Sequence, residues 1–485
     1  IKNKNLSKNQ LISKVNKVVA KSFELNNTHI EYIEKYLSKI HKRSSPREKV
    51  ITEIIDKYQP VKLEKYNSLH VERDDLRQQV TFTQNKKIPI HNWYKYVQGF
   101  SAVLVNTLIN ELEIKSDHIV LDPFNGCGTT TTVCSYRNIK SIGLEISPLM
   151  AEVSRIKTRR WNLDKIRFFI DNISQEKIDK KSFSNKSFVF EDYLSKAYSN
   201  PIKDKLIRIS NYILSQEDNE IKDLSKIALL SILEDVSLIR KHGSHYRYLN
   251  KDTSIGLQKL NINVISENEN IFLIFINQLN NLFNDISLTG GNPSKIANIK
   301  CLDSKSSKIK SNSIDFVITS PPYLNRNNYI AQQKAELDFL GLIQDKKEYK
   351  DLVKSTFRSH TDSNLSSSSN SSISEINTII QSIELEKGNN PKIPQMICGY
   401  FEDLKDSLRK LYKVLKKDGK CVFVVGNTRW GGVVVPVDHI LLKIAEELGF
   451  SPEKIYVTRL KGNSPQQMKK FGKIPVRESV VIFKK

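Results

Sequence analysis

Short apolar runs alternate with segments of helical period along much of this chain of 485 residues. Short runs rich in branched side chains predict buried strands, and apolar residues spaced three or four positions apart predict helices. The predicted strands are 118–121, 140–146, 299–303, 314–319, 421–425, 455–457 and 479–483. The clearest predicted helices are 100–112, 130–137, 206–214, 224–239, 271–283, 401–415 and 437–448. This order predicts an α/β fold with a mostly parallel sheet and right-handed crossovers.

Breaks in this alternation predict the domain organisation. Residues 1–88 are basic and helical in period, and residues 157–296 are mainly helical. The alternating pattern occupies residues 89–156 and 297–485. We therefore expect a helical N-terminal region and one α/β domain interrupted by a helical insertion. Residues 362–374 are almost entirely Ser and Asn, which bury too little apolar surface to become ordered, so we expect a mobile loop there.

The charge balance suggests a polyanionic partner. The chain has 76 Lys and Arg against 53 Asp and Glu, a net charge of +23. Such an excess favours binding to nucleic acid through the release of counterions, although a composition rich in Lys, Ile and Asn also fits an AT-rich genome. No stretch is apolar for long enough to span a bilayer, and the five cysteines lack metal-ligand spacing. We expect a cytoplasmic protein without a bound metal.

A rigid turn follows one of the predicted strands. Ser320-Pro321-Pro322-Tyr323 comes directly after the apolar run 314–319. Two prolines end the strand ladder, because proline has no N–H to donate. The turn therefore lies at the C-terminal end of a strand, where open α/β sheets bind their ligands.

A glycine loop lies upstream, between the first two strands of the predicted sheet. Gly126 and Gly128 allow a tight turn and a close approach to a ligand, and Thr129 or Thr130 can cap the following helix. Glu145, near the end of the next strand, can accept hydrogen bonds from ribose hydroxyls. The loop lacks the Gly-Lys-Ser/Thr ending of a P-loop, which disfavours ATP. The predicted cofactor-binding residues are Asp122, Pro123, Phe124, Gly126, Gly128, Thr129, Thr130, Glu145 and Asp303.

The loop 122–130 and the turn 320–323 together resemble motifs of the class I S-adenosylmethionine-dependent DNA methyltransferases that modify amino groups. Ser-Pro-Pro-Tyr is the form that this family uses mostly for N4 of cytosine. The resemblance covers roughly residues 90–155 and 297–485, including the segment 91–101 that packs over the methionine end of the cofactor in the family. It implies a Rossmann-like, mostly parallel seven-stranded sheet, S-adenosylmethionine as cofactor and Asp303 as an acceptor for the adenine amine. Family members commonly have Ser in place of Cys127.

The same resemblance assigns the chemistry to the turn. The Pro321 carbonyl and the Ser320 hydroxyl would accept hydrogen bonds from the target amine, and Tyr323 would stack on a base flipped out of duplex DNA. Methylation at C5 of cytosine would require a Pro-Cys nucleophile, and none of the five cysteines follows a proline. Adenine N6, an RNA amino group, and a non-catalytic nucleic-acid-binding subunit stay open as alternatives. The family also implies a prokaryotic restriction–modification or related defence system, with a possible nuclease partner.

The insertion 157–296 is the first candidate for the region that recognises the DNA sequence. Arg240, Lys241 and Arg247 could contact phosphates or guanine edges there. His242 and His245 lack a third metal ligand, so we predict no metal. The N-terminal helices and the Ser-rich loop are alternative DNA contacts. A C-terminal basic region is a third, comprising Arg459, Lys461, Lys469, Lys470, Lys473 and Arg477.

Overall fold

The computed structural model describes residues 60–485 with gaps. The gaps are 62, 181–187, 243–244, 249–269, 290–292, 294, 306–307, 366–369, 385–389, 463–468 and 470–474. Most of the expected helical N-terminal region, residues 1–59, therefore lies outside the described residues. The side chains of residues 242–248 are also outside the description, although the backbone of two short strands there is included.

An eight-stranded sheet forms the centre of the α/β domain, in the order β1-β11-β12-β8-β7-β2-β3-β6. Five neighbouring strands are parallel: β6 (Asn298–Cys301), β3 (Lys140–Glu145), β2 (Ile119–Asp122), β7 (Ile314–Thr319) and β8 (Leu415–Gly426). Next comes β12 (Val476–Lys484), which is antiparallel to both β8 and β11 (Ser451–Lys461). The expected α/β fold with a mostly parallel sheet is confirmed. The eighth strand, β1 (His70–Glu72), pairs in parallel with β11 at the edge and was not expected, because three residues give no apolar run.

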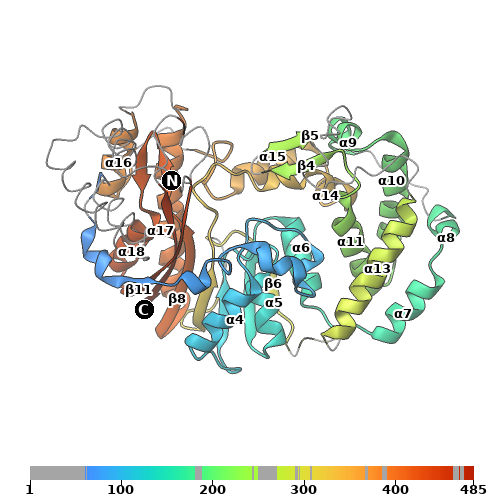
Figure 1. Cartoon of the computed structure of the whole chain (residues 1–485), viewed down its shortest axis with the longest axis horizontal. Helices are drawn as coiled ribbons and strands as arrows, with labels where there is room; N and C mark the ends of the chain where they lie inside the picture. The colour runs from blue at the N-terminus through green and yellow to red at the C-terminus, as the bar shows by residue number, and fades with distance from the viewer. Residues whose placement is uncertain are drawn as a thin grey trace, which may run out of the picture.

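Helices cover both faces of this sheet, because its central strands are apolar on both sides (Figure 1). Along β2, Val120 packs in one core cluster with α4 (Ala102–Glu111) and α5 (Thr129–Tyr136). The next residue, Leu121, packs in the opposite cluster with α17 (Ile393–Val414) and α18 (Val437–Glu447). Successive side chains of a strand point to opposite faces, so this one strand helps to fill both layers.

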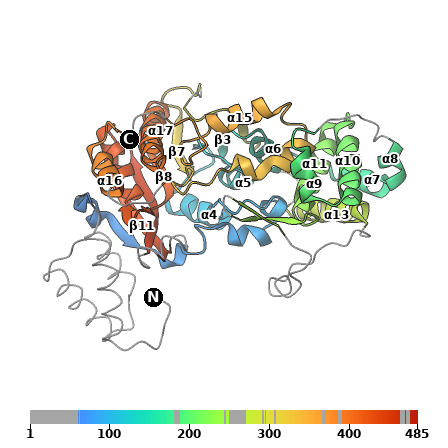
Figure 2. The same ribbon diagram turned by 90° about the horizontal axis from the view of Figure 1, so that it is seen from above.

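The insertion forms a helical layer at the other end of the molecule from α16 (Ser374–Glu384), as both views show (Figures 1 and 2). Its helices are α7 (Leu163–Asn172), α8 (Gln175–Lys180), α9 (Glu191–Ala197), α10 (Asn200–Leu214), α11 (Asn219–Leu233) and α13 (Ile271–Leu288). It shares one apolar core with α6 (Pro148–Lys157) and α14 (Lys334–Phe339). The α/β domain and the insertion are therefore packed against each other through a common core.

The predicted helix 224–239 is wrong beyond residue 233. A hairpin of β4 (Ile239–His242) and β5 (His245–Tyr248) begins where the helix was expected to end. The backbone N–H of Leu238 donates to the carbonyl of Ala197 at 2.7 Å, which turns the chain away from the helix axis. A long-range hydrogen bond of this kind has no signature in the local apolar period.

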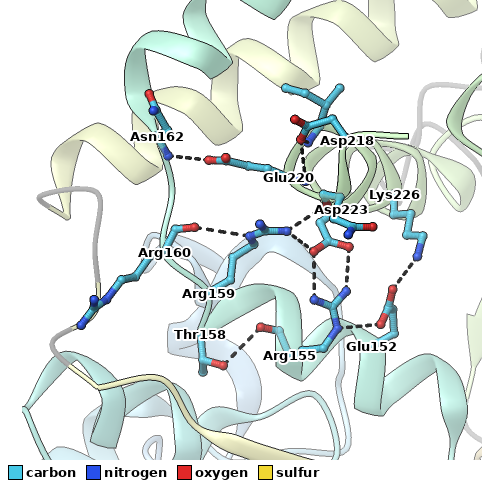
Figure 3. A network of polar contacts seen from close by, with 12 residues as sticks. Glu152, Arg155, Thr158, Arg159, Arg160, Asn162, Asp218, Glu220, Asp223 and Lys226 are labelled. Carbon is cyan, nitrogen blue, oxygen red and sulfur yellow. Dashed lines mark hydrogen bonds and ion pairs between the residues drawn. The ribbon is translucent and has the colours of Figure 1, made fainter. Parts of the chain in front are cut away.

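A network of ion pairs joins the insertion to the α/β domain (Figure 3). Asp223 of α11, whose side chain is 4% exposed, accepts from Arg155 of α6 at 2.7 and 2.9 Å. Arg159 also pairs with Asp223. Beside them, Lys226 lies 2.5 Å from Glu152. A buried carboxylate with two guanidinium partners holds its geometry well, so this network fixes the position of α11 on α6.

The Ser-rich segment differs from the expected mobile loop in its described parts. Ser371 and Ser372 both bond to Glu402 of α17, at 3.0 and 3.1 Å, and Ile373 is buried. Residues 366–369 lie outside the described residues. The hydroxyls of Ser371 and Ser372 thus donate to a carboxylate of a neighbouring helix. The composition of the segment does not reveal this long-range contact. None of the helices among the described residues is both long and apolar enough to cross a membrane.

Candidate active site

The glycine loop and the Ser-Pro-Pro-Tyr turn line the same open cavity, whose volume is about 1050 Å³ when the space open to solvent is included. The loop follows β2 and the turn follows β7, two adjacent parallel strands, so both lie at the same edge of the sheet. The predicted site residues that line the cavity are Asp122, Pro123, Phe124, Gly126, Thr129, Glu145, Asp303, Ser320, Pro321, Pro322 and Tyr323. Gly128 and Thr130 do not line it.

Two glycines in left-handed conformation shape the loop. Gly126 has φ 50° and Gly128, at the start of α5, has φ 83°. A Cβ atom on Gly128 would lie 2.3 Å from Ser154 Oγ, so only glycine fits at this position. Asn125 between β2 and α5 donates to Ser154 Oγ at 2.6 Å and accepts from Thr131 at 2.9 Å. The loop backbone is thus held in place by side chains that do not have to touch a ligand.

Two carboxylates flank the loop, the buried Asp122 and the half-buried Glu145. Asp122 accepts from the Thr319 hydroxyl at 2.6 Å, and burial raises the pKa of Asp122 to about 6. Glu145 accepts from the N–H of Gly126 at 2.7 Å and from that of Ser147 at 2.8 Å. Burial raises the pKa of Glu145 to about 7, against the lowering effect of these two bonds. Both groups can therefore change protonation near neutral pH.

The Ser-Pro-Pro-Tyr turn is supported by β8 and β12. The Ser320 hydroxyl donates to the carbonyl of Val424 at 2.9 Å. The Tyr323 hydroxyl donates to Glu478 at 2.8 Å, and Lys461 Nζ lies 4.6 Å from the centre of the Tyr323 ring. Burial, with Glu478 nearby, raises the pKa of Tyr323 well above its usual value. The Tyr323 ring is therefore neutral and held at both its hydroxyl and one face.

Sequence reasoning missed several residues of this cavity. Thr356, Phe357 and His360 line it from the segment after α15 (Lys346–Ser355). Thr356 Oγ1 lies 2.9 Å from His360 Nε2, and Phe357 packs edge-on against Phe124 with ring centres 5.4 Å apart. The segment follows a helix far along the chain and carries no glycine pattern, so no local signal connects it with the loop 122–130.

The predicted C-terminal basic region does not form one exposed basic surface, because three of its cations have partners within the protein. Arg477 is fully buried and donates to Asp438 at 3.1 Å. Arg459 and Lys461 both pair with Glu478. Lys469 is exposed, whereas Lys470 and Lys473 lie outside the described residues. Charge along the sequence did not distinguish these internal partners from surface cations.

Two of the three candidate DNA contacts in the insertion also make internal contacts. Arg240 donates to the carbonyls of Glu234 and Ser237 at 2.8 and 2.9 Å. Lys241 pairs with the buried Glu336. Arg247 of β5 lies opposite Arg240 in the hairpin register. No cluster of three metal-ligating side chains occurs within the described part of the chain.

A sheet of this order, with a glycine loop and a Pro-Pro turn in one cavity, defines a class I methyltransferase fold. Residues 2–156 match a family model described as DNA methylase. The type II methyltransferase M.BsoBI of Geobacillus stearothermophilus is 32% identical, over 84% of this chain and 88% of that protein. The type II methyltransferases M.AvaI of Nostoc sp. and of Anabaena variabilis are each 31% identical, over 84% of this chain and 89% of theirs.

The chain therefore belongs to the type II DNA methyltransferases. DNA is the substrate of this family and S-adenosylmethionine is its methyl donor.

Proposed function

We propose that the chain transfers a methyl group from S-adenosylmethionine to the exocyclic N4 of cytosine in duplex DNA. The observation that carries this proposal is the shared cavity of the loop 122–130 and the turn 320–323. The Ser-Pro-Pro-Tyr form of the turn favours cytosine. The relatives are type II methyltransferases, which supports a role in a restriction–modification system with a nuclease partner.

The cavity has features that suit the cofactor. Gly126 leaves room that a Cβ would fill, since that atom would lie 3.0 Å from Tyr96 Cε1. Glu145 has acceptor capacity for ribose hydroxyls beyond its two backbone bonds, and Asp303 can accept from the adenine amine. The negative charge of Asp122 favours a cationic ligand nearby. When bound, S-adenosylmethionine supplies an activated methyl group as a sulfonium, so the residues of this chain mainly need to align the amine.

The contacts of the turn suit an acceptor role. The Ser320 hydrogen is directed to the Val424 carbonyl, so the Oγ lone pairs are available to accept from the target amine. Accepting from the amine concentrates its lone pair on nitrogen, which makes it a better nucleophile. Lys461 covers one face of the Tyr323 ring, and Tyr323 also lines the active-site cavity, where a flipped base would stack on it.

Nucleoside analysis tests the chemistry. Plasmid DNA is incubated with the protein and S-adenosylmethionine carrying a deuterated methyl group, then digested and analysed by mass spectrometry. We expect the label in N4-methylcytosine. Label in N6-methyladenine would assign the reaction to adenine, and label only in added RNA would assign it to RNA. No label in any nucleoside would contradict catalysis and favour a binding subunit.

We further propose that the insertion 157–296 recognises the DNA sequence, with the hairpin β4–β5 as part of the contact. Arg247 is tested first, because Arg240 and Lys241 have partners within the protein and the side chain of Arg247 lies outside the described residues. Replacing Arg247 with Ala should lower the salt slope of duplex binding by about one unit if it contacts a phosphate. If the salt slope of duplex binding and the sequence preference are both unchanged, Arg247 does not contact the DNA and another segment recognises the sequence.

A further inference from the structure

A second cavity adjoins the active-site cavity where the insertion meets the α/β domain. Its volume is about 710 Å³ when the space open to solvent is included, and its wall includes Lys86, Lys95, Val97, Lys241 and Gln332. We call it the vestibule. It shares four wall residues with the active-site cavity, namely Tyr96, Gln98, Tyr329 and Gln333. The two cavities are therefore neighbours that share these four residues in their walls.

The vestibule has cations that can change partners. Lys95 is half exposed and pairs at 2.5 Å with Asp235, whose side chain is 56% exposed. An ion pair this open to water is weak, so a phosphate can displace Asp235. Lys86 is exposed and has no ion-pair partner among the described residues. Lys241, by contrast, is held by Glu336 inside the wall.

Two other side chains of the vestibule, those of Val97 and Gln332, present groups that the protein itself does not cover or pair. Val97 lines the vestibule and is 60% exposed, so its side chain is accessible to a ligand. Gln332 is only 6% exposed, and its Oε1 accepts from Gln98 at 3.0 Å, but its Nε2 has no hydrogen-bond partner. A buried N–H donor without a partner indicates an acceptor that arrives with a ligand.

We infer that the vestibule is the surface that grips duplex DNA around the extruded nucleotide, an inference that rests on the proposed function. Lys86 and Lys95 contact the phosphates on either side of that nucleotide. Gln332 donates to one of its oxygen atoms as it passes toward the active-site cavity. Val97 enters the space that the base leaves in the duplex, which keeps the neighbouring bases from closing it.

The role of Val97 is tested by comparing matched and mismatched substrates. A mismatch at the target base removes most of the cost of opening the pair, so a residue that holds the gap matters less. Val97→Ala should lower single-turnover methylation of the matched duplex by about tenfold and that of the mismatched duplex by about twofold. The matched control is Val71→Ala, which removes the same atoms from an exposed residue of the edge strand β1. It should change neither rate.

The phosphate contact is tested through salt dependence. Lys95→Ala should lower the slope of log Kd against log salt by about one unit. The control is Lys65→Ala, because Lys65 is also an exposed lysine paired with an exposed carboxylate, that of Glu446. It should leave the slope unchanged. S-adenosylmethionine affinity should stay at the wild-type value in all four variants, because none of the four substituted residues lines the active-site cavity.

The outcomes separate this inference from the proposed function. If the wild-type protein methylates DNA but Val97→Ala affects both duplexes equally or neither, the vestibule does not hold the opened duplex. An unchanged slope of log Kd against log salt for Lys95→Ala would show that Lys95 does not contact a phosphate of the DNA. If the wild-type protein methylates no DNA, the proposed function itself fails.

Discussion

Removing the Tyr323 ring is the sharpest perturbation of the catalytic turn. Tyr323→Ala removes the face on which the flipped base would stack, a contribution of about 1–3 kcal/mol per base. At 1.36 kcal/mol per tenfold in rate, kcat/KM for DNA should fall by about 5- to 150-fold. Tyr323→Phe keeps the ring and loses only the hydrogen bond to Glu478. That variant should lose about 1.5–3 kcal/mol of unfolding free energy, as expected for a bond to a charged group, but less of its activity than Tyr323→Ala.

The assay is transfer of a radiolabelled methyl group to duplex DNA under initial-rate conditions. Cofactor affinity, measured by calorimetry, should be nearly unchanged in both variants, since Tyr323 is not among the residues expected to hold the cofactor. Denaturant unfolding provides the stability comparison. Wild-type kcat/KM in Tyr323→Ala would refute the stacking argument. Equal activity losses in the two variants would show that the hydroxyl bond, rather than the ring face, supports the reaction.

Three further predictions concern the cofactor loop and the buried ion pair. Gly126→Val should raise the calorimetric Kd for S-adenosylmethionine by more than about tenfold without unfolding the protein, because φ is 50° and the added atoms meet Tyr96. An unchanged Kd would show that the loop does not bind the cofactor. Cofactor affinity should fall as pH drops below about 7, because Glu145 becomes protonated and a neutral carboxyl accepts more weakly; a flat affinity between pH 6 and 8 would contradict this role. Asp438→Asn should cost about 3–5 kcal/mol of unfolding free energy by leaving Arg477 buried without its charge partner, and a loss below about 1 kcal/mol would show that the pair is not isolated from water.

Much of the α/β domain could be predicted from local signals. Strand β7 (Ile314–Thr319) was predicted with its observed bounds, because an apolar run ends at two prolines. By contrast, β1 is three residues long and depends on its partner β11, and the end of α11 depends on a contact with Ala197. Elements of this kind are decided by tertiary contacts, which a local period does not record.

The candidate site divides in the same way. The loop 122–130 and the turn 320–323 are contiguous motifs, so their residues could be identified before their common cavity was known. Glu478 and His360 come from distant segments, and only the fold brings them to the turn and the cavity. Arg477 was assigned to a basic region for DNA contact, but the fold buries it in an ion pair with Asp438. The charge of a residue in the sequence does not show whether it is paired inside the protein.

The central claim is that one cavity brings the methyl donor and the target amine together. A structure of the protein with a non-reactive cofactor analogue and a duplex containing the recognition site tests this most directly. The account predicts the analogue against the loop 122–130 and a flipped cytosine at Ser320, with its N4 about 3–3.5 Å from the group that replaces the methyl donor. A target base that stays stacked in the duplex, or an analogue bound outside the cavity, would contradict the account.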